Sequence, residues 1–236
     1  MLSKHVHGDH MVHSHRDVSG GSARAAVFGV SDGLVSNAAL IIGVAGAAND
    51  GSTVVAAGVA GLIAGAFSMA AGEYVSVKAE SELVTRELEI ERKSLEENPK
   101  SELAELTAIY EKRGLTKSEA QVLATAIHRD PEIALEVHAR EELGVDPDSI
   151  GDPGATAITS FIAFTVGAVI PLVPWFFASG NITIIISLLL AIATAAIVGT
   201  ALAHFTERPA LPTAARQVLV ATAACAVTYF VGTWIG

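Results

Sequence analysis

The chain has 236 residues, of which 51% are hydrophobic, and yet its formal net charge is −10. A disordered chain would be less hydrophobic, and a nucleic-acid binder would be basic, whereas this sequence has 25 acidic residues against 15 basic ones. Its one cysteine, Cys225, excludes an internal disulfide framework.

Charged residues are nearly absent from long stretches of the sequence. Asp32 is the only one from 25 to 48, Glu73 is the only one from 53 to 77, and none lies from 155 to 203. About 20 apolar residues suffice for a helix to cross a bilayer core, whereas a soluble helical core would need helices with a polar face. We therefore predict an all-α polytopic membrane protein. Its five transmembrane helices are expected at 25–48, 53–77, 155–178, 181–203 and 213–235.

The basic residues predict the orientation of the chain. Thirteen precede the first span or lie between the second and third, and the other two, Arg208 and Arg216, lie between the fourth span and the start of the fifth. The positive-inside rule places these segments in the cytosol, and hence the N-terminus too, with the C-terminus on the other side. The membrane would be the plasma (inner) membrane in a bacterium or a vacuolar-type membrane in a eukaryote. The expected parts are a cytosolic tail (1–24), two spans (25–77), a cytosolic acidic helical domain (78–150) and three spans (151–236).

The segment from 78 to 150 holds 18 acidic and 10 basic residues and reads as helical. Its first part, 80–97, contains neither Gly nor Pro and is expected to continue the second span beyond the membrane. Start and stop signals then divide the remainder into shorter helices. These signals are Asn98-Pro99, Gly114, the capping-box pair Thr116 and Glu119, Asp130-Pro131 and Gly144.

Some of these acidic residues share a helix face. Glu73, Glu80 and Glu87 recur every seven residues, and Glu91 follows four later, so they form one stripe. Carboxylates with an occasional imidazole suit Mn²⁺, Fe²⁺ and Zn²⁺, although a solvated charged surface is the alternative. The segment lacks the Glu-x-x-His pairs of a ferritin-like di-iron site. The other candidate ligands are the pair Glu102 and Glu105 and the cluster His138, Glu141 and Glu142.

Two acids fall inside predicted spans, where an ionisable group is costly and indicates function. Asp32 is too short to reach the interface, whereas Glu73 lies close enough to the end of its span to do so. Met69 lies one turn before Glu73 and offers a thioether, with ordinary packing as its alternative role. Ser36 and Asn37 add oxygens near Asp32.

Two further features bear on metal binding. Gly33 is expected to loosen the first span locally and free backbone carbonyls. Histidines punctuate the N-terminal tail, which either binds metal or has no task. They are His5, His7, His10, His13 and His15.

Four stretches together resemble the vacuolar iron transporter family. They are FGVSDGLVSNAALIIGVAGA, GLIAGAFSMAAGEYVSVKAESE, ELAELTAIYEKRGL and HAREELG. The resemblance implies dimeric proteins with five membrane helices per subunit and a cytosolic metal-binding domain between helices two and three. Such proteins exchange cytosolic Fe²⁺, and often Mn²⁺, Co²⁺, Ni²⁺ or Zn²⁺, for protons.

The resemblance also implies roles for single residues. The family's pore aspartate, pore methionine and second-helix glutamate look like Asp32, Met69 and Glu73. The glutamates of its metal-binding domain match Glu91, Glu102, Glu105 and Glu142. Two positions depart from the plant-type pattern, with Ser94 in place of a glutamate and His138 in place of a methionine, and Glu141 is a candidate substitute.

We therefore predict a transporter that exports Fe²⁺, or Mn²⁺, from the cytosol in exchange for protons. The expected partners are the lipid bilayer, divalent ions including Zn²⁺, protons and a second copy of the chain, with no nucleic acid and no prosthetic group. A membrane-anchored metal sensor or buffer is the alternative. An enzyme such as a ferroxidase is not expected, because the sequence shows no catalytic constellation or nucleotide-binding loop.

Overall fold

A computed structural model describes residues 21–48, 50–147 and 150–236. Helices and short connections make up this part of the chain, and it contains no strand. The α-helices are α1 (Gly21–Ala47), α2 (Gly51–Glu97), α3 (Pro99–Lys112), α4 (Lys117–Ile127), α5 (Pro131–His138), α6 (Pro153–Leu172), α7 (Asn181–Phe205) and α8 (Ala210–Ile235). A π-helix, η1 (Ala139–Leu143), follows α5, and a 3-10 helix, η3 (Val173–Phe176), follows α6.

Five helices are long and apolar enough to cross a membrane. They are α1, α2, α6 with its extension η3, α7 and α8, which confirms the five predicted spans. Pro171 lies in the last turn of α6, and Pro174 lies in the tighter helix that follows. The described part of the chain is therefore built as the hydropathy pattern predicts.

Helix α1 lies at the centre of the membrane helices and contacts α2, α6, α7 and α8. Gly33 lies on the closest approach of α1 to α6, because a Cβ there would collide with the backbone of Phe164. Small residues at helix contacts let backbones pack tightly in a bilayer. The expected loosening at Gly33 is wrong: α1 stays helical through this residue, whose role is close packing.

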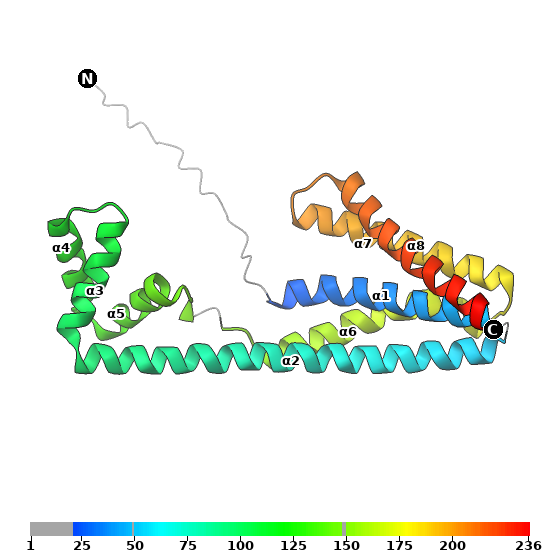
Figure 1. Cartoon of the computed structure of the whole chain (residues 1–236), viewed down its shortest axis with the longest axis horizontal. Coiled ribbons are helices and arrows are strands. Elements are labelled where there is room, and N and C mark those ends of the chain that lie inside the picture. The colour runs from blue at the N-terminus through cyan, green and yellow to red at the C-terminus, as the bar shows by residue number, and fades with distance from the viewer. Residues whose placement is uncertain (1–20, 49, 148–149) are drawn as a thin grey trace, which may run out of the picture.

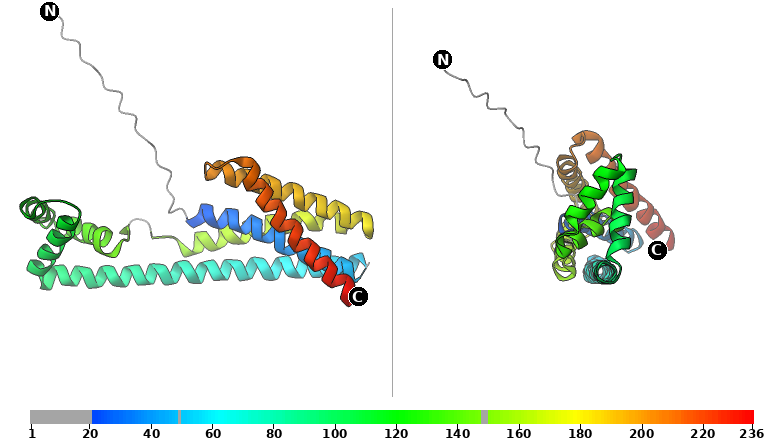
Figure 2. Two further views of the ribbon diagram at one scale, coloured as in Figure 1. Left: turned by 45° about the horizontal axis from the view of Figure 1, so that its top comes forward. Right: turned by 90° about the vertical axis from the view of Figure 1, so that its left-hand side faces the viewer.

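Helix α2 is a single rod of 47 residues, about 70 Å long at 1.5 Å per residue. Asp50 caps its first turn by accepting from the backbone N–H groups of Ser52 and Thr53. The first half packs against α1 and α6, and the second half extends well beyond them (Figures 1 and 2). The predicted continuation of the second span is confirmed.

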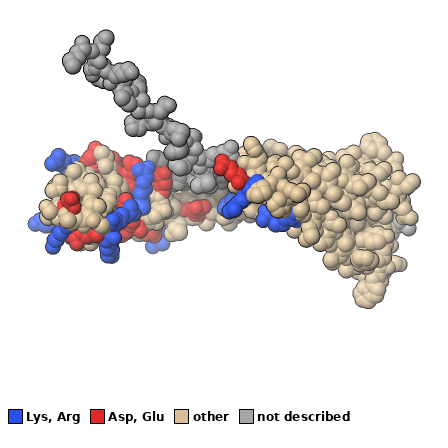
Figure 3. Space-filling view, turned by 90° about the horizontal axis from the view of Figure 1, so that it is seen from above, with Lys and Arg blue, Asp and Glu red and all other residues tan. Residues whose placement is uncertain are grey.

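The far end of α2 carries α3, α4, α5 and η1, which we call the insertion (Figure 1). Charged side chains gather over this end of the molecule, whereas uncharged residues cover the opposite end (Figure 3). The predicted caps are present: Thr116 and Glu119 form a capping box, and Asp130 caps α5. Gly144 ends η1 with a left-handed φ of 67°, a conformation that glycine adopts without strain.

Candidate functional site

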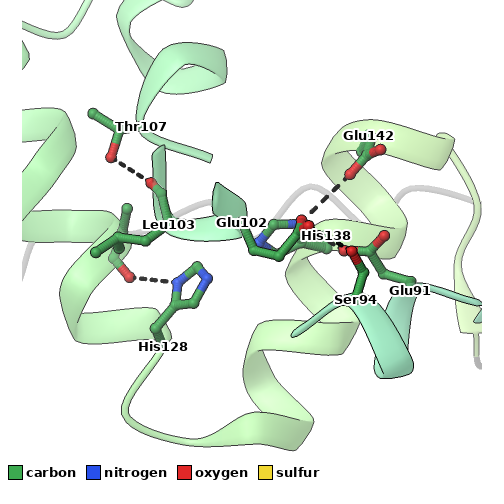
Figure 4. Close-up of polar contacts among 9 residues, drawn as sticks. Glu91, Ser94, Glu102, Leu103, Thr107, His128, His138 and Glu142 are labelled. Atoms are coloured by element: carbon green, nitrogen blue, oxygen red, sulfur yellow. Dashed lines mark hydrogen bonds and ion pairs between the residues drawn. The ribbon is translucent and has the colours of Figure 1, made fainter. Parts of the chain in front are cut away.

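Four predicted ligands converge where the insertion packs against the far end of α2 (Figure 4). Glu91 comes from α2, Glu102 from α3, His138 from the end of α5 and Glu142 from η1. Each offers one ligand atom, and these atoms all lie within 4.8 Å of one another. We call these four residues the acidic cluster.

His138 lies at the centre of the acidic cluster. Its Nδ1 is 2.9 Å from Oε1 of Glu91, 3.5 Å from Oε2 of Glu142 and 3.9 Å from Oε2 of Glu102. His138 is fully buried, Glu91 and Glu102 are each only 6% exposed, and Glu142 opens to solvent. The cluster is thus a buried site with one side accessible from outside.

Burial, and after it the neighbouring charges of Glu142, Glu102 and Glu105, together raise the pKa of Glu91 to about 7. Glu91 stands about 21 Å beyond Val77 along α2, outside the apolar part of this helix. Neither Oε1 of Glu91 nor Nδ1 of His138 has a well-formed hydrogen bond within the described residues. Carboxylates packed in this way repel unless a proton or a cation neutralises them.

The donor set of the acidic cluster comprises three carboxylates and one imidazole. Such oxygen-rich sites with one nitrogen suit Mn²⁺, Fe²⁺ and Zn²⁺ better than the soft Cu⁺ ion. Oε1 of Glu91 and Nδ1 of His138 face each other without a hydrogen bond, so both are available as ligand atoms and the residues fit a divalent metal ion.

Ser94 is the residue at which the resemblance to the plant-type pattern leads us to expect a glutamate. Its hydroxyl donates a hydrogen bond of 2.6 Å to Oε1 of Glu102, while Oε2 of Glu102 faces His138. The serine therefore orients a carboxylate of the cluster instead of adding one.

The other acids predicted for this site lie outside the group of four. Glu105 is exposed, although its charge still acts on Glu91. Glu141 forms an ion pair with Arg113. Glu80 is exposed and Glu87 is half-buried on the shaft of α2, nearer the membrane helices than Glu91 is.

A second constellation lies between α1, α2 and α6, around an open pocket of about 320 Å³. We call it the membrane pocket. Its walls bring together Asp32 with Ser36 from α1 and Met69 from α2, as the sequence predicts. The complete lining is Asp32, Ser36, Asn37, Leu40, Gly61, Gly65, Ser68, Met69 and Phe164.

Asn37 is the buried polar group of the membrane pocket, with 2% of its surface exposed. Its Nδ2 donates a hydrogen bond of 2.8 Å to the carbonyl of Ala168, which fixes the amide plane. Its Oδ1 has no partner in the described part of the chain. Ser36 instead donates to the backbone carbonyl of Asp32, at 2.6 Å. The side chains that line the pocket thus include a carboxylate, an amide oxygen and a thioether.

Glu73 lies one turn beyond Met69 on α2 and does not line the membrane pocket. Sequence reasoning missed Gly61 and Gly65, which open the α2 wall because a side chain there would collide with Leu40 or Phe164. The Gly-x-x-x-Gly spacing is the signal that could have found them. The predicted histidines of the N-terminal tail lie outside the described residues.

The sequence of the chain is similar to that of known proteins. The model of the VIT family matches residues 23–233. The chain is 30% identical to vacuolar iron transporter 1 of Eucalyptus grandis over 212 residues, which cover 89% of this chain and 85% of the relative. It is also 30% identical to vacuolar iron transporter 1 of Arabidopsis thaliana over 222 residues, covering 94% and 88% of the two chains. A vacuolar iron transporter of Acanthamoeba castellanii is 37% identical over 183 residues, covering 74% and 66%. The chain is an integral membrane protein and belongs to the VIT family.

Proposed function

We propose that this protein exports Fe²⁺, or Mn²⁺, from the cytosol in exchange for protons. The observation that carries the proposal is the membrane pocket, where Asp32, Asn37 and Met69 meet between helices apolar enough to span a bilayer. A carboxylate inside a membrane protein is costly and marks an ion pathway. The relatives named as vacuolar iron transporters support iron as the cargo.

The acidic cluster would collect ions before they enter the pathway. This role places the insertion in the cytosol, as the distribution of basic residues favours. Asp32 and Met69 would then pass the ion through the membrane pocket, with Glu73 beside its cytosolic entrance. Protons compete with metal for the same carboxylate oxygens, which couples the two fluxes in principle.

We further propose a homodimer in which a second copy covers the pocket. Phe28, Asp32, Ser36 and Leu40 recur every four residues on α1 and are all exposed in the single chain. A lipid-facing carboxylate at Asp32 would be unfavourable, so a protein partner on this face is favoured over acyl chains. The pathway would then run between the two subunits.

Flux into proteoliposomes tests the proposal. Vesicles with an acidic lumen should take up Fe²⁺ through the wild-type protein, and Asp32→Asn should reduce the initial rate at least about tenfold, because an ionic ligand of the ion is lost. Glu89→Gln, a neutralised acid on the exposed side of α2, is the matched control and should transport normally. Wild-type flux through Asp32→Asn would overturn the mechanism. Uptake of Fe²⁺, Mn²⁺ and Zn²⁺ in the same vesicles identifies the preferred cargo.

A membrane-anchored metal sensor or buffer is the second candidate. It is favoured by the position of the acidic cluster at the far end of α2, well away from the membrane pocket. Saturable metal binding without any flux of Fe²⁺, Mn²⁺ or Zn²⁺ would support this function and exclude transport.

A further inference from the structure

His128 follows the last residue of α4 and packs against the acidic cluster from outside it (Figure 4). Its Nδ1 lies 2.9 Å from the backbone carbonyl of Ala124. A carbonyl oxygen can only accept, so Nδ1 of His128 carries the hydrogen of this bond. Nε2 of the neutral ring is therefore an acceptor with a free lone pair.

This acceptor is buried and unused. Nε2 of His128 has no hydrogen-bond partner within the ranges that the structure describes. The ring meets that of His138 edge to face, with centroids 5.2 Å apart and planes at 81°. A direct hydrogen bond between ring nitrogens needs a separation of about 3 Å, and one bridging water can join them across a longer gap.

His138 has the complementary group. Its Nδ1 faces the three carboxylates of the cluster, so Nδ1 is the nitrogen placed to bind an ion. A metal-bound neutral imidazole carries its hydrogen on the other nitrogen, here Nε2. Nε2 of His138 is also buried and without a partner among the described residues. A buried donor and a buried acceptor thus lie on two touching rings.

We propose that His128 is a positioning residue for the metal ligand His138: Nε2 of His128 accepts the Nε2–H of His138, directly or through one water. This bond would hold His138 in the tautomer that presents Nδ1 to the ion. Partners of this kind fix ring orientation and raise the basicity of metal-binding histidines. The inference rests on the proposed metal site and assigns His128, which no ligand pattern in the sequence includes, to its support.

Two substitutions distinguish the effect of the acceptor lone pair on Nε2 of His128 from the effect of ring packing. His128→Phe keeps an aromatic ring against His138 but removes the acceptor, whereas His128→Gln keeps an acceptor near the position of Nε2. In the detergent-solubilised full-length protein, we expect His128→Phe to weaken Mn²⁺ binding by about 10- to 100-fold and His128→Gln by less than about threefold. Thr125→Ala, an exposed change on the same helix, is the control and should bind like the wild type.

Nitrogen NMR of ¹⁵N-histidine-labelled wild-type protein loaded with Zn²⁺ provides a second readout that does not depend on any variant folding. We expect His128 as the Nδ1–H tautomer and His138 as the Nε2–H tautomer. A protonated Nε2 on His128 would overturn the proposal.

Equal binding by all variants, or equal loss in His128→Phe and His128→Gln, would also overturn it, because the ring packing alone would then matter. If the wild-type protein bound no Mn²⁺, both the metal site and this inference would fall. Wild-type binding that is unaffected by His128→Phe would remove the inference and leave the metal site standing.

Discussion

The hydroxyl of Ser94 holds Oε1 of Glu102 by a 2.6 Å hydrogen bond across the turn that joins α2 to α3. This contact directs the second oxygen of Glu102 toward His138. Where the plant-type pattern would add a glutamate ligand, the Ser94 hydroxyl thus orients the carboxylate of Glu102 instead.

Ser94→Ala should weaken Mn²⁺ binding by the acidic cluster about tenfold, because a hydrogen bond to a charged group contributes about 1.5 kcal/mol. Calorimetric titration of the full-length protein measures the change. Ser101→Ala removes an exposed hydroxyl at the start of α3 and should have no effect. Equal affinity in Ser94→Ala and the wild type would show that Glu102 needs no such support.

The raised pKa of Glu91 predicts how the stability of the metal-free insertion depends on pH. The pKa rises from 4.5 to about 7 on folding, so the folded state favours the protonated carboxyl. The contribution of Glu91 to the free energy of unfolding should therefore be most favourable below pH 4.5, and it should be lost as the pH rises through about 7. Hydrogen exchange of the insertion at pH 5 and pH 8 measures this loss. Glu91→Gln should remove it, and a loss of the same size in that variant would contradict the assignment.

Metal binding should show the opposite trend. An ion must displace the proton of Glu91, so Mn²⁺ affinity should rise by up to about tenfold per pH unit until the pH passes about 7. Proton release measured during the titration gives the number displaced. Affinity that does not change between pH 5.5 and 7.5, as probed by this titration, would place the ion away from Glu91.

Gly65 predicts a steric effect on transport. An alanine there would collide with the ring of Phe164 and narrow the membrane pocket, so Gly65→Ala should lower Fe²⁺ flux at least about fivefold, a mild overpacking effect. Gly72→Ala is the matched control, because a Cβ at this position of the same helix meets nothing within 4 Å. Similar flux in the two variants would mean that ions do not pass through this pocket.

Substitution of Asn37 tests whether its uncharged Oδ1 serves as an ion ligand in the membrane pocket. Asn37→Leu keeps the branching of the side chain but removes the unpartnered Oδ1, together with the hydrogen bond from Nδ2 to Ala168. We expect Fe²⁺ flux to fall about tenfold as a ligand is lost. Mn²⁺ binding by the distant acidic cluster should stay unchanged, which distinguishes a pathway defect from misfolding. Loss of binding at the cluster as well would point to a general structural fault.

The spans and helix caps could be predicted from the sequence because each is a local property. Absence of charge over about 20 residues defines a span, and Thr116 with Glu119 defines a helix start without any tertiary contact. The convergence of the acidic cluster could not be derived in this way. Which of Glu102 and Glu105 turns inward depends on how α3 crosses α2, and the structure selects Glu102.

The position of His128 escaped prediction for the same reason. Nothing in the sequence places a residue at the end of α4 against one at the end of α5, and only the folded insertion brings the two rings together. At Gly33, the interpretation of glycine as a residue that loosens its own helix is wrong, because the backbone of α6 packs into the space that a side chain would occupy.

The continuity of α2 sets a kinetic limit on the proposed transport. Met69 and Glu91 are separated by about 33 Å of unbroken helix, too far for an ion to bridge both sites at once. An ion held at the acidic cluster must dissociate fully before it can reach the membrane pocket, so residence time at the cluster limits turnover. Tighter capture would improve loading when metal is scarce and slow the maximal rate when it is plentiful.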